Sequence, residues 1–149
     1  MYVVYESRDG TVCAGTLSGG VSELRNGHFT NHTTANGLSS NTVSAIAEGA
    51  DGTMWFGTPD GANSFSQGHW NTYRTTEGLP SDDVNCLFED STGVLWTGTS
   101  KGLAFFKTGY VQLPRGLPAS LREPTLGIAK ADGFGLQPRI TCCVFNGIR

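Results

Sequence analysis

A set of short motifs returns along this chain with a period of about 41 residues, and this repeat limits the possible folds more than any other feature. A Gly-Thr pair marks each copy, at Gly15-Thr16, Gly57-Thr58 and Gly98-Thr99. Other residues keep the same spacing, namely Glu6, Glu48 and Glu89, then Gly10, Gly52 and Gly93. A unit of this length buries its apolar faces against its neighbours, so the chain is expected to form a row of similar units.

Each unit is predicted to contain four short strands. In the second unit we expect them at residues 42–48, 53–58, 62–66 and 69–74, separated by glycine-bearing turns. Four antiparallel strands in a repeat of about 40 residues are typical of a β-propeller blade. We therefore predict an all-β fold, a β-propeller segment of three four-stranded antiparallel blades plus a partial fourth. The predicted blades are residues 2–41, 42–82, 83–121 and 122–149, the last with an atypical tail from about residue 134.

Large aromatic residues occupy one repeated position, just before the Gly-Thr pair. Trp55 and Trp96 stand there, and we interpret them as residues that fill the core between blades, with ligand stacking as the alternative. Cys13 takes this position in the first unit, so we expect the first blade to pack less well at that point. The structural residues of the repeat are then Trp55, Trp96, Gly57, Gly98, Thr58 and Thr99.

Composition excludes several classes of partner. The chain has 10 basic and 13 acidic residues and a net charge of -3, so it offers no basic stripe for nucleic acid and no polybasic patch for a membrane. It contains no apolar run of the roughly 20 residues that span a bilayer. Its first residues lack the features of a secretory signal, and the chain as written is therefore expected in the cytoplasm.

The residues that could act in catalysis or bind a metal show no catalytic or metal-binding arrangement. The four cysteines form no CxxC motif, and the three histidines lack metal-ligand spacing. Glu89 repeats as Glu6 and Glu48, which favours an architectural role over a paired-carboxylate site. We predict that the protein is not an enzyme, with no cofactor and no metal.

Two segments, VSAIAEGADGTMWFGTPDGA (43–62) and VNCLFEDSTGVLWTGTSKGL (84–103), resemble the two-component regulator propeller repeat. This family is found in the periplasmic sensor regions of hybrid histidine kinases. The resemblance implies a periplasmic parent that senses a ligand, often a polysaccharide fragment, without catalysis. We interpret the chain as a truncated fragment of such a sensor. Residues 134–149 are interpreted as a frameshifted tail, because a shifted frame permits a continuation like the family's next strands.

Two alternative functions stay open. One is a protein-interaction scaffold, which shares the propeller fold. The other is a sialidase-like glycosidase fragment, because the D-x-G-x-x-W hairpins loosely resemble Asp-box turns. A ligand, a carbohydrate or another small molecule, is expected at the loops that connect the blades, since propeller loops converge there. The candidate residues are Asn36, Asn41, Glu77, Asp82, Asp83 and Asn85.

Association is the last expectation. An open row of blades leaves an apolar face uncovered at each end, and soluble monomers rarely expose such patches. We predict a homodimer that closes a propeller ring head to tail. In it, Val3, Val4 and Val12 of one copy meet terminal strands around Leu126 and Ile128 of the other.

Overall fold

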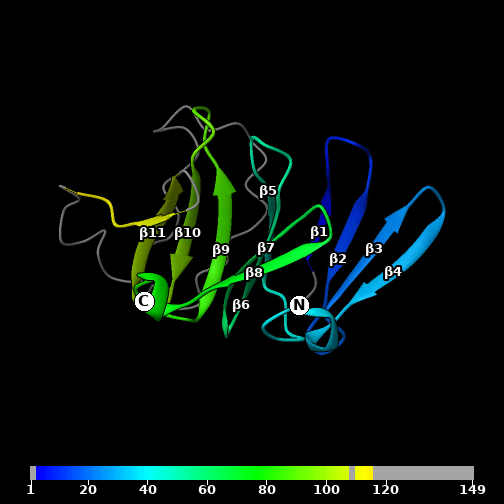
Figure 1. Cartoon of the computed structure of the whole chain (residues 1–149), viewed down its shortest axis with the longest axis horizontal. Coiled ribbons are helices and arrows are strands. Elements are labelled where there is room, and N and C mark those ends of the chain that lie inside the picture. The colour runs from blue at the N-terminus through cyan, green and yellow to red at the C-terminus, as the bar shows by residue number, and fades with distance from the viewer. Residues whose placement is uncertain (1–2, 108–109, 116–149) are drawn as a thin grey trace, which may run out of the picture.

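The computed structural model describes residues 3–107 and 110–115, which form three four-stranded antiparallel sheets standing side by side (Figure 1). Blade 1 contains β1 (Val3–Glu6), β2 (Val12–Gly15), β3 (Val21–Arg25) and β4 (His28–His32). Blade 2 contains β5 (Ala45–Glu48), β6 (Met54–Thr58), β7 (Gly61–Ser66) and β8 (His69–Tyr73). Blade 3 contains β9 (Val84–Glu89), β10 (Leu95–Thr99), β11 (Gly102–Lys107) and β12 (Tyr110–Gln112). The predicted fold class is confirmed, and the expected fourth blade and its tail lie outside the described residues.

The innermost strands β1, β5 and β9 lie next to one another. The turns between the first two strands of each blade, residues 7–11, 49–53 and 90–94, gather at one end of the sheets, which we call the hairpin end (Figure 1). The opposite end, called the connector end, carries the short 3-10 turns η1 (Thr34–Asn36) and η2 (Thr75–Glu77). No helix in the part of the chain described here is long and apolar enough to cross a membrane.

The first strand of blade 2 is shorter than the sequence predicted. It begins at Ala45 rather than at residue 42, because the residues before it bond to two blades. The Val43 amide donates to the Thr16 carbonyl of blade 1 at 2.8 Å, and the Ser44 amide donates to the Gly57 carbonyl of its own blade at 2.8 Å. Ser44 Oγ also donates to the Val84 carbonyl of blade 3 at 2.6 Å, so this short segment links three blades.

The core between blades 2 and 3 is built around Trp55, which is only 8% exposed. Its ring centroid lies 4.3 Å from that of Phe106 in blade 3 and 5.4 Å from that of Tyr73. Trp96 holds the same repeat position in blade 3, where it is half-buried against Phe88 and Phe105 of its own sheet. Among the described residues, no further blade covers the face of blade 3 that carries Trp96.

The repeated Gly-Thr pair has a physical explanation in this packing. A Cβ atom on Gly57 would lie 2.9 Å from Val84 Cγ1, and one on Gly15 would lie 2.8 Å from Val43 Cγ1. Glycine therefore lets the inner strand of the next blade approach closely. The following threonine closes the next turn. Thr58 Oγ1 donates to the Gly61 carbonyl at 2.9 Å, and Thr99 Oγ1 donates to the Gly102 carbonyl at 2.8 Å.

Blade 1 packs against blade 2 around a small cavity of about 70 Å³ that Cys13 lines. Both polar and apolar residues line this gap. Among the polar ones, the Glu23 carboxylate is 2.9 Å from His32 Nε2 and 3.4 Å from Arg25 Nε. Cys13 itself is buried, 3% exposed, and the poorer packing expected at this position stays a prediction.

One residue expected on the uncovered face of blade 1 lies elsewhere. Val3 is 8% exposed and belongs to the core that faces blade 2, so that expectation is wrong. The reason is strand alternation, which sends neighbouring side chains to opposite faces. Val4 is 58% exposed, and Val12, which stands beside Glu6 across the sheet, shares its face.

Candidate functional site

A cavity of about 330 Å³ opens at the hairpin end, between the innermost strands of the three blades. This volume lies within the range of small-molecule sites. Its lining contains both apolar and polar residues. The apolar residues are Tyr5, Ile46, Ala47, Leu87 and Phe88, and the polar residues are Arg8, Glu48, Glu89, Asp90 and Ser91.

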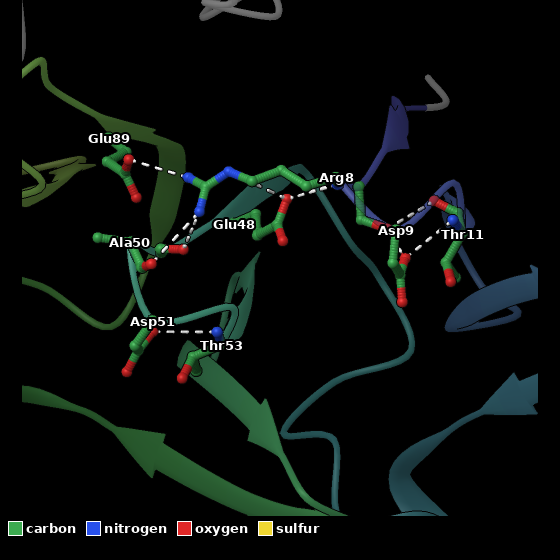
Figure 2. A network of polar contacts seen from close by, with 10 residues as sticks. Arg8, Asp9, Thr11, Glu48, Ala50, Asp51, Thr53 and Glu89 are labelled. Carbon is green, nitrogen blue, oxygen red and sulfur yellow. Dashed lines mark hydrogen bonds and ion pairs between the residues drawn. The ribbon is translucent and has the colours of Figure 1, made fainter.

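Arg8, in the first turn of blade 1, is part of the cavity lining and extends toward Glu48, Ala50 and Glu89 of the other two blades (Figure 2). Its amide donates to Glu48 Oε2 at 2.9 Å, and its Nη2 donates to Glu89 Oε1 at 3.1 Å. Nη1 reaches the carbonyls of Gly49 and Ala50, each at 3.3 Å. A single side chain from blade 1 therefore contacts both other blades, including one that is not its neighbour in the row.

Glu89 carries a carboxylate that is only partly satisfied. Oε1 bonds to Arg8, whereas Oε2 is buried and has no hydrogen-bond partner among the described residues. Burial raises the pKa of Glu89, and the nearby Arg8 guanidinium opposes that shift. A buried acceptor without a partner costs free energy.

Asp90, beside it, is fully used by its own turn. Oδ1 accepts from the amides of Thr92 at 2.8 Å and Val94 at 3.1 Å, and Oδ2 accepts from Trp96 Nε1 at 2.9 Å. Burial pushes the pKa of Asp90 upward, but these hydrogen bonds outweigh burial and lower the pKa. Asp90 thus shapes the hairpin and holds Trp96, while Glu89 has an acceptor to offer.

Four of the six candidates predicted from the sequence lie at the connector end, away from this cavity, in two copies of one turn. Asn36 Oδ1 accepts from the Thr33 amide at 3.0 Å, and Glu77 Oε2 accepts from the Arg74 amide at 2.7 Å. In the same way, Asn41 Oδ1 accepts from the Thr34 amide at 2.9 Å and Asp82 Oδ1 from the Thr75 amide at 2.7 Å. These oxygens close the turns around η1 and η2, and a ligand role for them stays a prediction.

The other two candidates begin the inner strand of blade 3. The Asp83 carbonyl accepts from the Ser100 amide at 3.0 Å. Asn85 lies where the register between β9 and β10 shifts by a bulge, at the position that Ser44 holds in blade 2. The structure does not bring Asp83 and Asn85 together with Arg8 and Glu89, and their ligand role also stays a prediction.

The rim of the cavity was not predicted, because its glutamates stand at a repeated position, which favours an architectural role. Glu48 and Glu89 belong to a repeated position, but Arg8 does not, since Ala50 and Ser91 hold its place in the other units. A charged residue that breaks a repeat was the available signal. Arg8 marks the turn that carries a positive charge its two copies lack.

Fold and cavity together define the class: the described residues are a segment of a β-propeller whose innermost strands line a small-molecule-sized hollow. The sequence model of the two-component regulator propeller family matches residues 37–60 and 78–101. The chain therefore contains two-component regulator propeller repeats, as its sequence predicted.

Solved structures share the fold at low identity. The extracellular domain of BT4673 from B. thetaiotaomicron, described as a one-component system, is 19% identical with a TM-score of 0.62, over 76% of this chain and 18% of that one. Virginiamycin B lyase from Staphylococcus aureus is 14% identical with a TM-score of 0.60, over 79% of this chain and 42% of that one. The chain thus spans less than half of either structure. No curated protein matches it.

Proposed function

We propose that this chain is a non-enzymatic, ligand-sensing segment of a two-component regulator propeller, and that its ligand binds in the hairpin-end cavity. The observation that carries the proposal is the cavity itself, which is lined by apolar and polar residues, among them Glu89, whose Oε2 has no hydrogen-bond partner among the described residues. The similarity to an extracellular domain supports a periplasmic parent. A cytoplasmic location of the chain as written stays a prediction.

The chemistry of the other polar gap supports binding rather than catalysis. Burial raises the pKa of Cys13 to about 11, so this residue stays a thiol at neutral pH. His32 is held against Glu23 at 2.9 Å and packs on Phe65 and Trp70. Neither side chain is placed to act as a nucleophile or a base on a ligand in the hairpin-end cavity.

Thermal shift with a broad panel of sugars, amines and organic acids tests this proposal, together with a turnover assay on each compound that binds. Stabilisation without turnover is the expected result. Turnover of a bound glycoside would overturn the non-enzymatic assignment and favour the glycosidase alternative. A panel without any stabilising compound would overturn the sensing role and favour an interaction scaffold.

We also propose that two copies associate head to tail. Trp55 of blade 2 packs against Phe106 of blade 3, and Trp96 occupies the matching face of blade 3. The outer face of blade 1 carries Leu24, which stands at the repeat position of Phe106 and is only partly buried. A second copy can therefore repeat an interface that the molecule already uses, with Leu24 packed near the other copy's Trp96.

Light scattering tests the association, with the substitution Trp96→Glu expected to leave a monomer of 15.8 kDa. The control is Leu17→Glu, at an exposed position in the turn after β2, which should leave the dimer intact. A wild-type monomer at tens of micromolar concentration would refute the dimer.

A further inference from the structure

One arginine side chain joins the three blades at the hairpin end. Arg8 Nη2 donates to Glu89 Oε1 of blade 3 at 3.1 Å, and Nη1 donates to the blade 2 carbonyls of Gly49 and Ala50, each at 3.3 Å (Figure 2). We call the first of these contacts the Arg8–Glu89 bridge. Its strength depends on the charge of a carboxylate, whereas the carbonyls of blade 2 do not titrate.

The carboxylate of this bridge is poorly compensated on its other side. The Glu89 side chain is 20% exposed, and its Oε2 is buried without a hydrogen-bond partner among the described residues. Burial raises the pKa of Glu89, the charge and hydrogen bond of Arg8 lower it, and the charges of Glu48 and Asp90 raise it. The net direction is upward, so Glu89 takes up a proton at a higher pH than an ordinary glutamate.

The other charged groups at the bridge respond differently to acid. Arg8 stays protonated throughout, as guanidinium groups do. Burial pushes the pKa of Asp90 upward, but its hydrogen bonds outweigh burial and lower the pKa, so Asp90 stays ionised when Glu89 is neutral. Glu48 accepts the Arg8 amide at 2.9 Å, with its Oε2 3.9 Å from Arg8 Nε, and a carboxyl group can accept an amide in either protonation state. The bond of Arg8 to blade 3 is thus more sensitive to acid than its bonds to blade 2.

We infer that the Arg8–Glu89 bridge is an acid-sensitive contact between blades 1 and 3: uptake of a proton by Glu89 weakens it, while Arg8 stays bound to blade 2. The physical reason is that a neutral carboxyl group still accepts a hydrogen bond but lacks the charge that makes the bond to a guanidinium strong. Both residues belong to the lining of the hairpin-end cavity, so acid releases the blade 3 side of that lining from blade 1. The contact needs no ligand, and the inference therefore goes beyond the proposed ligand sensing.

A double-mutant cycle at two pH values tests this inference. The variants are Arg8→Gln, Glu89→Gln and the two combined, and urea denaturation of dilute protein followed by far-UV circular dichroism gives their stabilities. At pH 7 the double variant should lose less than the sum of the single losses, by a factor of about two to five in the unfolding equilibrium constant. At pH 4, where most of Glu89 is neutral, the two losses should add.

Blade 1 supplies a matched control, the ion pair between Arg25 Nη2 and Asp9 Oδ2 at 2.8 Å. Hydrogen bonds, the largest from Ser7, lower the pKa of Asp9 to about 2, so this pair stays charged at pH 4. The cycle of Arg25→Gln and Asp9→Asn should therefore give the same coupling at both pH values. Carbon-13 NMR of the carboxyl groups in the wild-type protein adds a readout that needs no variant to fold: Glu89 should titrate with a midpoint above the ordinary 4.5, while Asp9 is still ionised at pH 4.

Each other outcome overturns the inference in a recognisable way. Additive losses at pH 7 would show that the bridge contributes no energy between the blades. Equal coupling of Arg8 and Glu89 at pH 7 and pH 4, or a Glu89 midpoint at or below 4.5, would refute its sensitivity to acid. Loss of coupling in both pairs at pH 4 would mean a general effect of acid and would reject a specific role of Glu89. None of these results decides ligand sensing, which the thermal-shift panel tests separately.

Discussion

Replacing the two tryptophans that share one repeat position compares the packing of a blade face that a neighbouring blade covers with that of a face that no other described blade covers. Trp55→Ala removes a side chain that is 8% exposed and lies 4.3 Å, centroid to centroid, from Phe106. Removal of a buried tryptophan costs about 3–5 kcal/mol, because contacts are lost and a cavity is left. Against a total stability of about 5–15 kcal/mol for a typical domain, this is a large fraction.

Trp96→Ala makes the same chemical change in a half-buried side chain, on the face of blade 3 that no other described blade covers. It loses ring contacts within one sheet and the 2.9 Å bond from its Nε1 to Asp90. We expect a cost of about 1–2 kcal/mol, since part of the ring is already exposed to solvent. In dilute, monomeric protein the two variants should therefore differ by about 2–3 kcal/mol.

Urea denaturation followed by far-UV circular dichroism measures both costs, because this signal does not depend on the number of tryptophans. Dilute protein keeps the association proposed above from adding to the result. Equal losses in the two variants would refute the reasoning. They would mean that Trp96 is covered as fully as Trp55, by another part of the chain or by a second copy.

Other predictions concern pH, turns and the cavity rim. A hydrogen bond from Ser7 lowers the pKa of Asp9 from 3.8 to about 2, with further contributions from bonds to Thr11 and the charge of Arg25. The ionised Asp9 therefore stabilises the folded state above pH 3.8, and this contribution is lost as the pH falls through 2. Asp9→Asn should therefore lower the urea midpoint at pH 7 but not at pH 2, and Asp51→Asn, in the matching turn with one amide bond at 3.0 Å, should cost less. Gly61→Ala should lower the unfolding free energy more than Gly68→Ala. A Cβ on Gly61 would lie 2.5 Å from the Tyr73 carbonyl oxygen, whereas one on Gly68 would meet open space. For Gly68→Ala, the positive φ alone predicts a cost of about 1–2 kcal/mol. Burial raises the pKa of Glu89, so its ionised form opposes folding, and the stability of Glu89→Gln relative to wild type should rise between pH 4 and pH 7 in urea titrations; a fall would contradict this reading of the carboxylate.

Much of the fold could be predicted from short stretches of sequence. In blade 2, strands expected at 53–58, 62–66 and 69–74 are observed at Met54–Thr58, Gly61–Ser66 and His69–Tyr73. The reason is that turn residues and the alternation of side chains act over a few neighbours, and each repeat states them again. The start of β5 was missed because Val43 and Ser44 bond to other blades, which a local pattern does not contain.

The cavity rim depended on tertiary structure. Arg8 and Glu89 are separated by 81 positions in the chain, and only the stacking of three blades brings their side chains to 3.1 Å. The role of the connector candidates also depended on the folded structure. The sequence predicts Asn36 and Glu77 as polar loop residues, but in the folded turns their side-chain oxygens accept hydrogen bonds from backbone amides. By itself, the sequence determined the repeat, the strands and the residues between blades, because those follow from local spacing. The structure decided which polar atoms are left unsatisfied, because that depends on the partners that the neighbouring blades supply.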